Sequence, residues 1–119
     1  MPPYIKNEGA TVLTTEYTDF VSIMKTKLLG MKRATLVLIN QHASYQFTYR
    51  GLVSNNPEGT SGTFTPVALD AEGNTSASLA GESSRPLEIY TPWAWIDVQI
   101  KSEGDSESPQ AAVWLLAVG

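Results

Sequence analysis

His42 is the only histidine of the chain and the only imidazole that could act as a general base. It lies between an apolar run and a tyrosine-rich run, where a turn is expected, and no sequence cue supplies a partner for proton transfer. The stretch Gly81-Glu82-Ser83-Ser84 lacks the Gly-x-Ser-x-Gly spacing that exposes a nucleophilic serine. We interpret both stretches as turns and predict that the chain is not an enzyme.

Carboxylates gather in two places, at Asp70 and Glu72 and again at Glu103, Asp105 and Glu107. Alternating acids in a loop can supply oxygen ligands to Ca²⁺, but neither group has the EF-hand spacing. The chain contains no cysteine, which excludes disulfides and thiolate metal sites. There is also no phosphate-binding glycine loop. We therefore expect solubilising acidic loops, with no metal and no cofactor.

The charge balance limits the choice of partner. Charged residues make up 17% of the 119 residues and the formal net charge is −4, whereas soluble domains average roughly 25% charged residues. Binding to nucleic acid needs a basic field, so none is expected. No apolar run approaches the roughly 20 residues of a membrane span, and Met1 is not followed by a secretory pattern. No membrane partner is expected either.

Two segments near the C-terminus carry the clearest structural signal. Residues 94–101 alternate, with Ala94, Ile96, Val98 and Ile100 on one side and polar residues or Trp95 on the other. This period of two predicts a strand with one buried face. Residues 111–118 are apolar on both faces. Because a chain end is normally polar and frayed, we expect this segment to be paired inside a sheet or covered by another chain.

The remaining segments are read as short strands and turns. Residues 34–40 are an apolar β-branched run and residues 45–50 alternate, so the two are predicted to form a hairpin. Residues 54–62 form the longest predicted loop. Residues 18–29 fit a helix by spacing but are rich in strand formers, and a strand at 18–24 is favoured. Weaker strands are predicted at residues 11–15, 63–70, 75–79 and 87–90, with Pro66 marking an edge.

These elements predict an all-β fold, a single antiparallel β-sandwich or jelly-roll-like barrel of about seven or eight strands. Pro2 and Pro3 disfavour helix, so residues 1–10 are expected to be an extended N-terminal arm ahead of a sandwich domain at 11–119.

Aromatic residues are the best candidates for contacts. Trp95 shares its predicted face with polar residues and is interpreted in three ways: as a cap on the core edge beneath the 54–62 loop, as an interface anchor, or as a platform for a sugar ring. Trp93 and Tyr90 would join it in the last case. Trp114 lies in the terminal segment, where it or its neighbours must face something other than water.

Three stretches together suggest a family: Lys32–Asn40 followed by the tyrosine-containing strand, Leu79–Ser83, and Pro92–Ser102. Their succession over residues 32–119 resembles the small β-sandwich virion proteins of tailed bacteriophages, including head decoration (cement) proteins and tail or collar components. No catalytic residue belongs to this pattern.

The resemblance implies a structural protein that is assembled in the host cytoplasm and binds the major capsid protein or other virion proteins at the capsid surface. It also implies a homo-oligomer such as a trimer. We expect Pro3, Tyr4 and Ile5 of the arm, together with Trp93, Trp95 and Trp114, to form its interfaces. A tail, collar or baseplate component and a carbohydrate-binding module are the alternatives.

Overall fold

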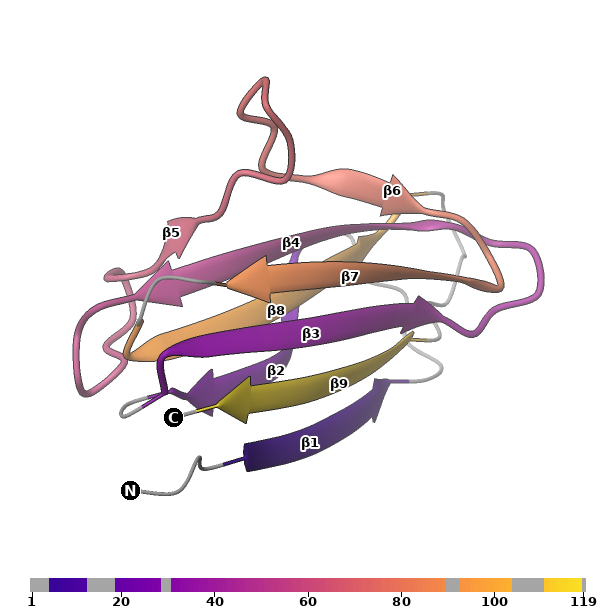
Figure 1. The fold of residues 1–119 in the computed structure, drawn as a ribbon. Helices are drawn as coiled ribbons and strands as arrows, with labels where there is room; N and C mark the ends of the chain where they lie inside the picture. The colour runs from indigo at the N-terminus through magenta and orange to yellow at the C-terminus, as the bar shows by residue number, and fades with distance from the viewer. Residues whose placement is uncertain (1–4, 13–18, 29–30, 90–92, 104–110, 119) are drawn as a thin grey trace.

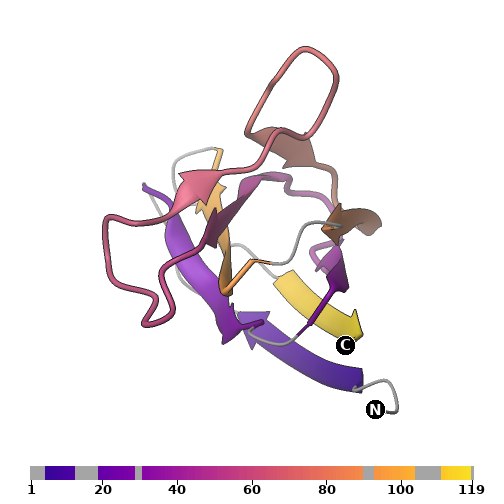
Figure 2. The ribbon, with the colours of Figure 1, turned by 60° about the vertical axis from the view of Figure 1, so that its left-hand side comes forward.

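The computed structural model describes residues 5–12, 19–28, 31–89, 93–103 and 111–118. Within these ranges, nine strands form two antiparallel sheets that face each other (Figures 1 and 2). The predicted all-β sandwich is therefore confirmed. The strands are β1 (Ile5–Val12), β2 (Val21–Lys27), β3 (Arg33–Asn40), β4 (Phe47–Ser54), β5 (Thr65–Pro66), β6 (Ala77–Leu79), β7 (Ser83–Ile89), β8 (Trp95–Ser102) and β9 (Ala111–Val118).

We call the two layers sheet A and sheet B. Sheet A has the order β1-β9-β3-β7, and sheet B has the order β2-β8-β4-β5, with β6 also paired to β4. The core lies between them, because the strands of both sheets direct alternate apolar side chains inward. Its fully buried members include Leu36 and Leu38 of β3, Val113 and Leu115 of β9, Phe47 and Tyr49 of β4, and Ile96, Val98 and Ile100 of β8.

The prediction that residues 34–50 form a hairpin is wrong. Strand β3 pairs with β7 and β9 in sheet A, whereas β4 pairs with β8, β5 and β6 in sheet B. The intervening turn thus carries the chain from one layer to the other. Alternation shows that each strand has a buried face, but it does not distinguish a neighbour in the same sheet from one across the core.

The ambiguous segment 18–29 contains a strand, β2, as favoured, but the strand covers Val21–Lys27 instead of residues 18–24, and the helical alternative is wrong. A bulge between Ser22 and Met24 shifts its register against β8. Beyond the bulge Met24 and Thr26 are buried while Lys25 is exposed. The extra residue interrupts the period of two, which explains why the sequence pattern was mixed.

Residues 5–10, expected as part of an extended arm, belong to sheet A. Strand β1 pairs with β9 over its whole length, from Ile5 opposite Val118 to Val12 opposite Ala111. The proposed boundary at residue 10 therefore falls inside a strand. Pro3 and Tyr4 lie outside the described residues. No helix in the described ranges is long and apolar enough to cross a membrane.

Candidate interaction surface

The outer face of sheet A exposes large apolar side chains. Strand β9 buries Val113 and Leu115 in the core and directs Trp114 and Leu116 outward, where they are 52% and 45% exposed. Of the two alternatives expected for residues 111–118, pairing inside a sheet is the one observed, because β9 is paired on both edges, by β1 and β3. Trp114 and Leu116 nevertheless remain uncovered by the described residues.

Neighbouring strands extend this exposed area. Across the sheet, Val37 of β3 lies opposite Trp114 on one side and opposite Pro86 of β7 on the other. Residues opposite one another in adjacent strands share a face. We define the apolar patch as Val37, Ile39, Pro86, Trp114 and Leu116; Val37 and Ile39 are half-buried, and Pro86 is exposed. Covering Trp114 and Leu116 would contribute about 1–3 kcal/mol through removal of apolar area from water.

The outer face of sheet B is different, because it carries a network of polar side chains that pair with one another. Asp97 accepts hydrogen bonds from Ser22 Oγ at 2.5 Å and from Gln99 Nε2 at 2.9 Å. Gln99 Oε1 in turn accepts one from Arg50 Nε at 2.7 Å. The Arg50 guanidinium lies 4.0 Å from the centre of the Phe20 ring. This chain of contacts ties β2, β8 and β4 together.

Trp95, predicted as an interface residue, lies on this covered side. Its indole N–H donates to the carbonyl oxygen of Pro57 at 3.0 Å, and Gly59 packs against the indole so tightly that a β-carbon there would lie 2.7 Å from the ring. Lys25 Nζ donates to the carbonyl of Gly59 at 3.1 Å. The 55–64 loop therefore lies over Trp95, which agrees with the interpretation of Trp95 as covered by this loop. An interface role for it stays a prediction.

The predicted site residues are not brought together. Trp93 packs against the core, Trp95 lies under a loop of sheet B, and Trp114 lies on the outer face of sheet A. Tyr90, Pro3 and Tyr4 fall outside the described residues, and Ile5 opens β1. Leu116 and the half-buried residues of β3 were not singled out from the sequence. The alternation in residues 111–118 could have identified Leu116, because it is two residues from Trp114.

The residues considered for catalysis or metal binding have structural roles. His42 Nδ1 accepts hydrogen bonds from the backbone N–H groups of Ser44 and Tyr45, at 3.1 and 3.0 Å, and its ring stacks on Tyr45. Asp70 accepts from the backbone N–H groups of Glu72 and Asn74 and from the Asn74 side chain. No cluster of potential metal ligands occurs among the described residues.

Glu103 joins strands at one end of sheet B. Its carboxylate accepts hydrogen bonds from Gln46 Nε2 at 2.7 Å, from Thr48 Oγ1 at 2.9 Å and from Ser78 Oγ. These donors come from β4, β6 and the turn before β4, so the carboxylate is a cross-strand clamp. Asp105 and Glu107, its expected companions, lie outside the described residues.

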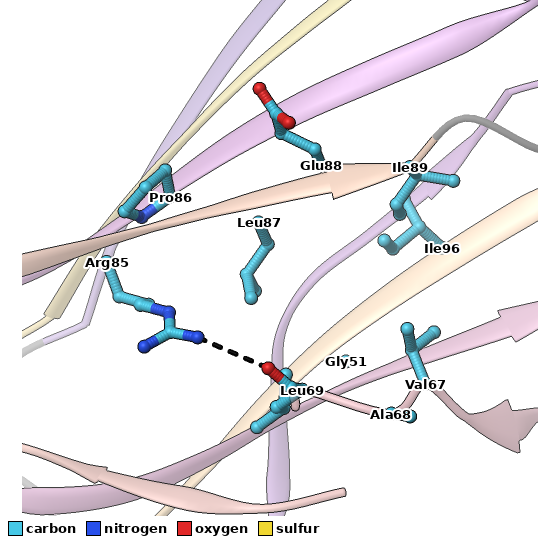
Figure 3. A pocket seen from close by; sticks show the side chains of 10 residues that line it. All are labelled: Gly51, Val67, Ala68, Leu69, Arg85, Pro86, Leu87, Glu88, Ile89 and Ile96. Carbon is cyan, nitrogen blue, oxygen red and sulfur yellow. Dashed lines mark hydrogen bonds between the residues drawn. The ribbon is translucent and has the colours of Figure 1, made fainter. Parts of the chain in front are cut away.

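A cleft of about 260 Å³ opens between β7 and the 67–69 segment (Figure 3). Leu87, Ile89 and Ile96 form its apolar floor, and Gly51 leaves room there because a β-carbon at this position would touch nothing. Arg85 Nη2 bridges the cleft to the Leu69 carbonyl at 3.3 Å. Nearby, burial raises the pKa of Tyr49 above its ordinary value, and the positive charge of Arg85 partly offsets this.

Comparisons with known proteins show the fold and no family. No protein-family model and no curated protein sequence matches the chain. Among solved structures, the SPBc2 prophage-derived protein YomS has a TM-score of 0.63 at 10% identity, over 100% of this chain and 96% of that one. A protein of the Bacillus endospore appendages, described as disulfide-linked pili, has a TM-score of 0.53 at 13% identity, over 98% and 90%.

A viral protein shares the same sandwich. The structure of infectious bursal disease virus, Gx strain, aligns with a TM-score of 0.51 at 12% identity, over 98% of this chain and 32% of that one. This chain thus corresponds to about a third of the viral chain. At these identities the similarity extends to the fold, which this chain shares with a prophage-derived protein, a pilus protein and a viral protein.

Proposed function

We propose that this chain is a non-enzymatic structural protein of a tailed-phage virion, a decoration protein that binds the major capsid protein at the capsid surface. The apolar patch on sheet A is the observation that carries the proposal. Large exposed apolar patches commonly mark sites at which a protein binds other proteins.

The fold supports the same function. The prophage-derived protein YomS matches over nearly the full length of both chains, and two further matches come from a pilus and a virus, both of which are assemblies. The pili are described as disulfide-linked, and this chain has no cysteine. Its contacts in an assembly therefore cannot be disulfides, and the apolar patch offers a non-covalent contact instead.

The sugar-binding alternative has less support. Stacking on a sugar needs an accessible aromatic face, but Trp95 is covered by the 55–64 loop and Trp93 packs against the core. Trp114 is accessible, but its opposite neighbours Val37 and Gly9 offer no polar side chain for sugar hydroxyls.

The decisive experiment locates the chain on purified particles. Mass spectrometry should find it in virions of the phage that encodes it, and gold labelling should mark the head. Labelling confined to the tail would support a tail, collar or baseplate component instead, and absence from virions would refute a structural role.

A matched pair of variants tests the patch. Trp114→Ser with Leu116→Ser should leave the fold intact, because both side chains are exposed, and should weaken binding to undecorated shells at least about tenfold. Tyr45→Ser is the control, since Tyr45 is also 45% exposed but lies outside the patch. Equal binding by the patch variant and the control would refute a role for sheet A.

A further inference from the structure

Sheet B has an interrupted edge beside β4. Strand β6 pairs with residues 47–49 of β4, and β5 pairs with Leu52 and Val53. The chain between β5 and β6, residues 67–76, leaves this edge and turns back as a projecting loop (Figure 1). At its start the Val67 N–H donates to the Gly51 carbonyl at 2.8 Å. Because the edge is split in this way, the space between the two layers stays open here and forms the cleft of Figure 3.

Strand β7 forms the opposite wall of the cleft and directs Arg85 into it. Leu87 lies opposite Leu36 of β3, and Arg85 lies opposite Leu38. Residues directly opposite one another on adjacent strands share a face, and Leu36 and Leu38 are fully buried. The side chains of Leu87 and Arg85 therefore point between the layers, whereas Glu88 points away from the cleft (Figure 3).

The cleft combines an apolar lining with one cationic group. Leu87, Val67 and Leu69 are apolar but only half-buried. The Arg85 guanidinium donates to the Leu69 carbonyl at 3.3 Å and has no other hydrogen-bond partner among the described residues. Its remaining N–H groups lie in a planar fork that matches the two oxygens of a carboxylate. Sites for small molecules are commonly built in this way, from an apolar lining and a few placed polar groups.

Gly51 keeps the cleft open. An inward charge on an edge strand also discourages pairing with another chain, which would account for the charge of Arg85 but not for the space in front of it. Gly51 is buried, and a β-carbon there would have no atom within 4 Å. Its φ is not in the left-handed region, so the backbone does not require glycine at this position. The missing side chain leaves room for a ligand.

We propose that this cleft binds a small aliphatic carboxylate, with the hydrocarbon chain on Leu87, Val67 and Leu69 and the carboxylate paired with Arg85. The cleft volume is about 260 Å³. An apolar cavity of about 150 Å³ holds benzene, and pockets for drug-sized ligands have roughly 300–1,000 Å³. A ligand of about eight non-hydrogen atoms, such as hexanoate, lies between these sizes. Binding is a property of the free protein and does not depend on the proposed virion role.

Titration of isotope-labelled protein with hexanoate, followed by NMR, tests the proposal. We expect a dissociation constant on the order of millimolar, because the ligand has few atoms, and amide shift changes in residues 67–69 and 85–89. Hexanol has the same chain without the charge and should bind at least about fivefold more weakly. Equal binding of the two would overturn the proposal. So would the absence of shift changes at these residues, or changes confined to the apolar patch on sheet A.

A matched pair of variants tests the cationic group. Arg85→Gln removes a charge at an exposed position and should weaken hexanoate binding about tenfold while leaving hexanol binding unchanged. Arg33→Gln removes a charge at another exposed position and should bind hexanoate like the unmodified protein. Equal affinities of the two variants for hexanoate would show that Arg85 does not hold the carboxylate and would refute the proposal.

Gly51→Val tests the cavity itself. Valine suits a strand, and its side chain would occupy the cleft, so binding of both hexanoate and hexanol should be lost. Circular dichroism checks that the variant is folded, and the comparison at Arg85 remains decisive if it is not. A folded Gly51→Val protein that binds hexanoate as well as the unmodified protein would place the ligand elsewhere and overturn the proposal.

Discussion

The sequence made Trp95 a candidate interface residue, but in the structure its side chain packs under a loop of the same chain. Its neighbours in residues 94–101 alternate, so the sequence places it on the outer face of its strand. The 55–64 loop folds over that face, and Gly59, at a φ of +62°, is the residue that makes the close approach possible. Only a glycine both adopts this backbone conformation without strain and leaves room for the indole.

Gly59→Ala should therefore lower the free energy of unfolding by about 2–4 kcal/mol, the sum of a left-handed backbone penalty and a steric conflict with Trp95. Gly73→Ala is the matched control. Gly73 also has a positive φ, +84°, but a β-carbon there would contact nothing, so about 1–2 kcal/mol is expected. Urea unfolding measures both, and equal losses would mean that contact with Trp95 is not the cause.

Hydrogen bonds within its loop lower the pKa of the Asp70 carboxyl group. The side-chain hydrogen bond from Asn74, followed by the backbone N–H of Asn74, lowers its pKa below the ordinary value of 3.8. Because the folded-state pKa is the lower one, the carboxylate contributes stability above the unfolded-state pKa, and this contribution is lost as the pH falls through the folded-state pKa.

The titration of Asp70, followed by carboxyl NMR, should accordingly have its midpoint below 3.8. Asn74→Ala removes the largest cause and should move the midpoint toward that value. A midpoint at or above 3.8 in the unmodified protein would show that the Asp70–Asn74 loop does not hold this geometry in solution.

At the scale of elements, the turn between β3 and β4 determines the topology. Asn40, at the end of β3, is fully buried, and its amide Nδ2 donates to the carbonyls of Tyr45 and Leu79, at 2.8 and 2.9 Å. Its Oδ1 accepts from the His42 backbone N–H at 2.9 Å. One side chain thus joins the end of sheet A, the crossing turn and β6 of sheet B.

Asn40→Asp keeps the size of the side chain but removes both N–H donors, and it places a carboxylate against two carbonyl oxygens. We expect a loss of about 2–5 kcal/mol, since buried acceptors are left without partners beside a buried charge. Thermal unfolding followed by circular dichroism measures it. A loss below about 0.5 kcal/mol would show that the crossing does not depend on this residue.

At Gly51, beside the cleft, a substitution is expected to raise stability, in contrast to the substitution at Asn40. Gly51→Ala places a methyl group in open space within a strand and should raise stability by about 0.5–1 kcal/mol. Gly81 has no positive φ either, but a β-carbon there would lie 2.7 Å from the His42 carbonyl oxygen, so Gly81→Ala should destabilise. Differential scanning calorimetry compares the two, and a destabilised Gly51→Ala would show that the cleft is filled in solution.

At the scale of the whole molecule, β9 is an interior strand of sheet A that contributes to the core. It lies between β1 and β3, so both of its backbone edges are bonded, and its inward side chains Ala111, Val113, Leu115 and Ala117 are fully buried. Removing it would take away a central strand, whereas removing β1 would take away an edge.

Deletion of residues 111–119 should therefore abolish cooperative unfolding, while deletion of residues 1–12 should leave a folded but less stable sandwich. Circular dichroism and urea titration distinguish these outcomes. A folded C-terminal deletion would contradict the central place of β9, as would unprotected amides at 111–118 in hydrogen exchange.

Sequence alone predicted the all-β class, β2 as a strand, the buried face of residues 94–101 and the pairing of residues 111–118 within a sheet. All of these follow from local features: the period of two in residues 94–101, which records the buried side of a strand, the strand-forming residues of β2, and the apolar character of both faces of residues 111–118. The sequence also predicted that Trp114 or its neighbours face something other than water, and the structure shows that the neighbours Val113 and Leu115 are the buried ones.

Only the tertiary structure determined which strands are partners, and therefore which surfaces are exposed. The apolar run 34–40 and the alternating run 45–50 were predicted to form a hairpin but lie in different sheets. Trp95 and Trp114, both outward on their strands, lie on opposite layers. Strand partners are set by long-range packing between segments such as β1 and β9, which lie at opposite ends of the chain, and a local pattern carries no information about it.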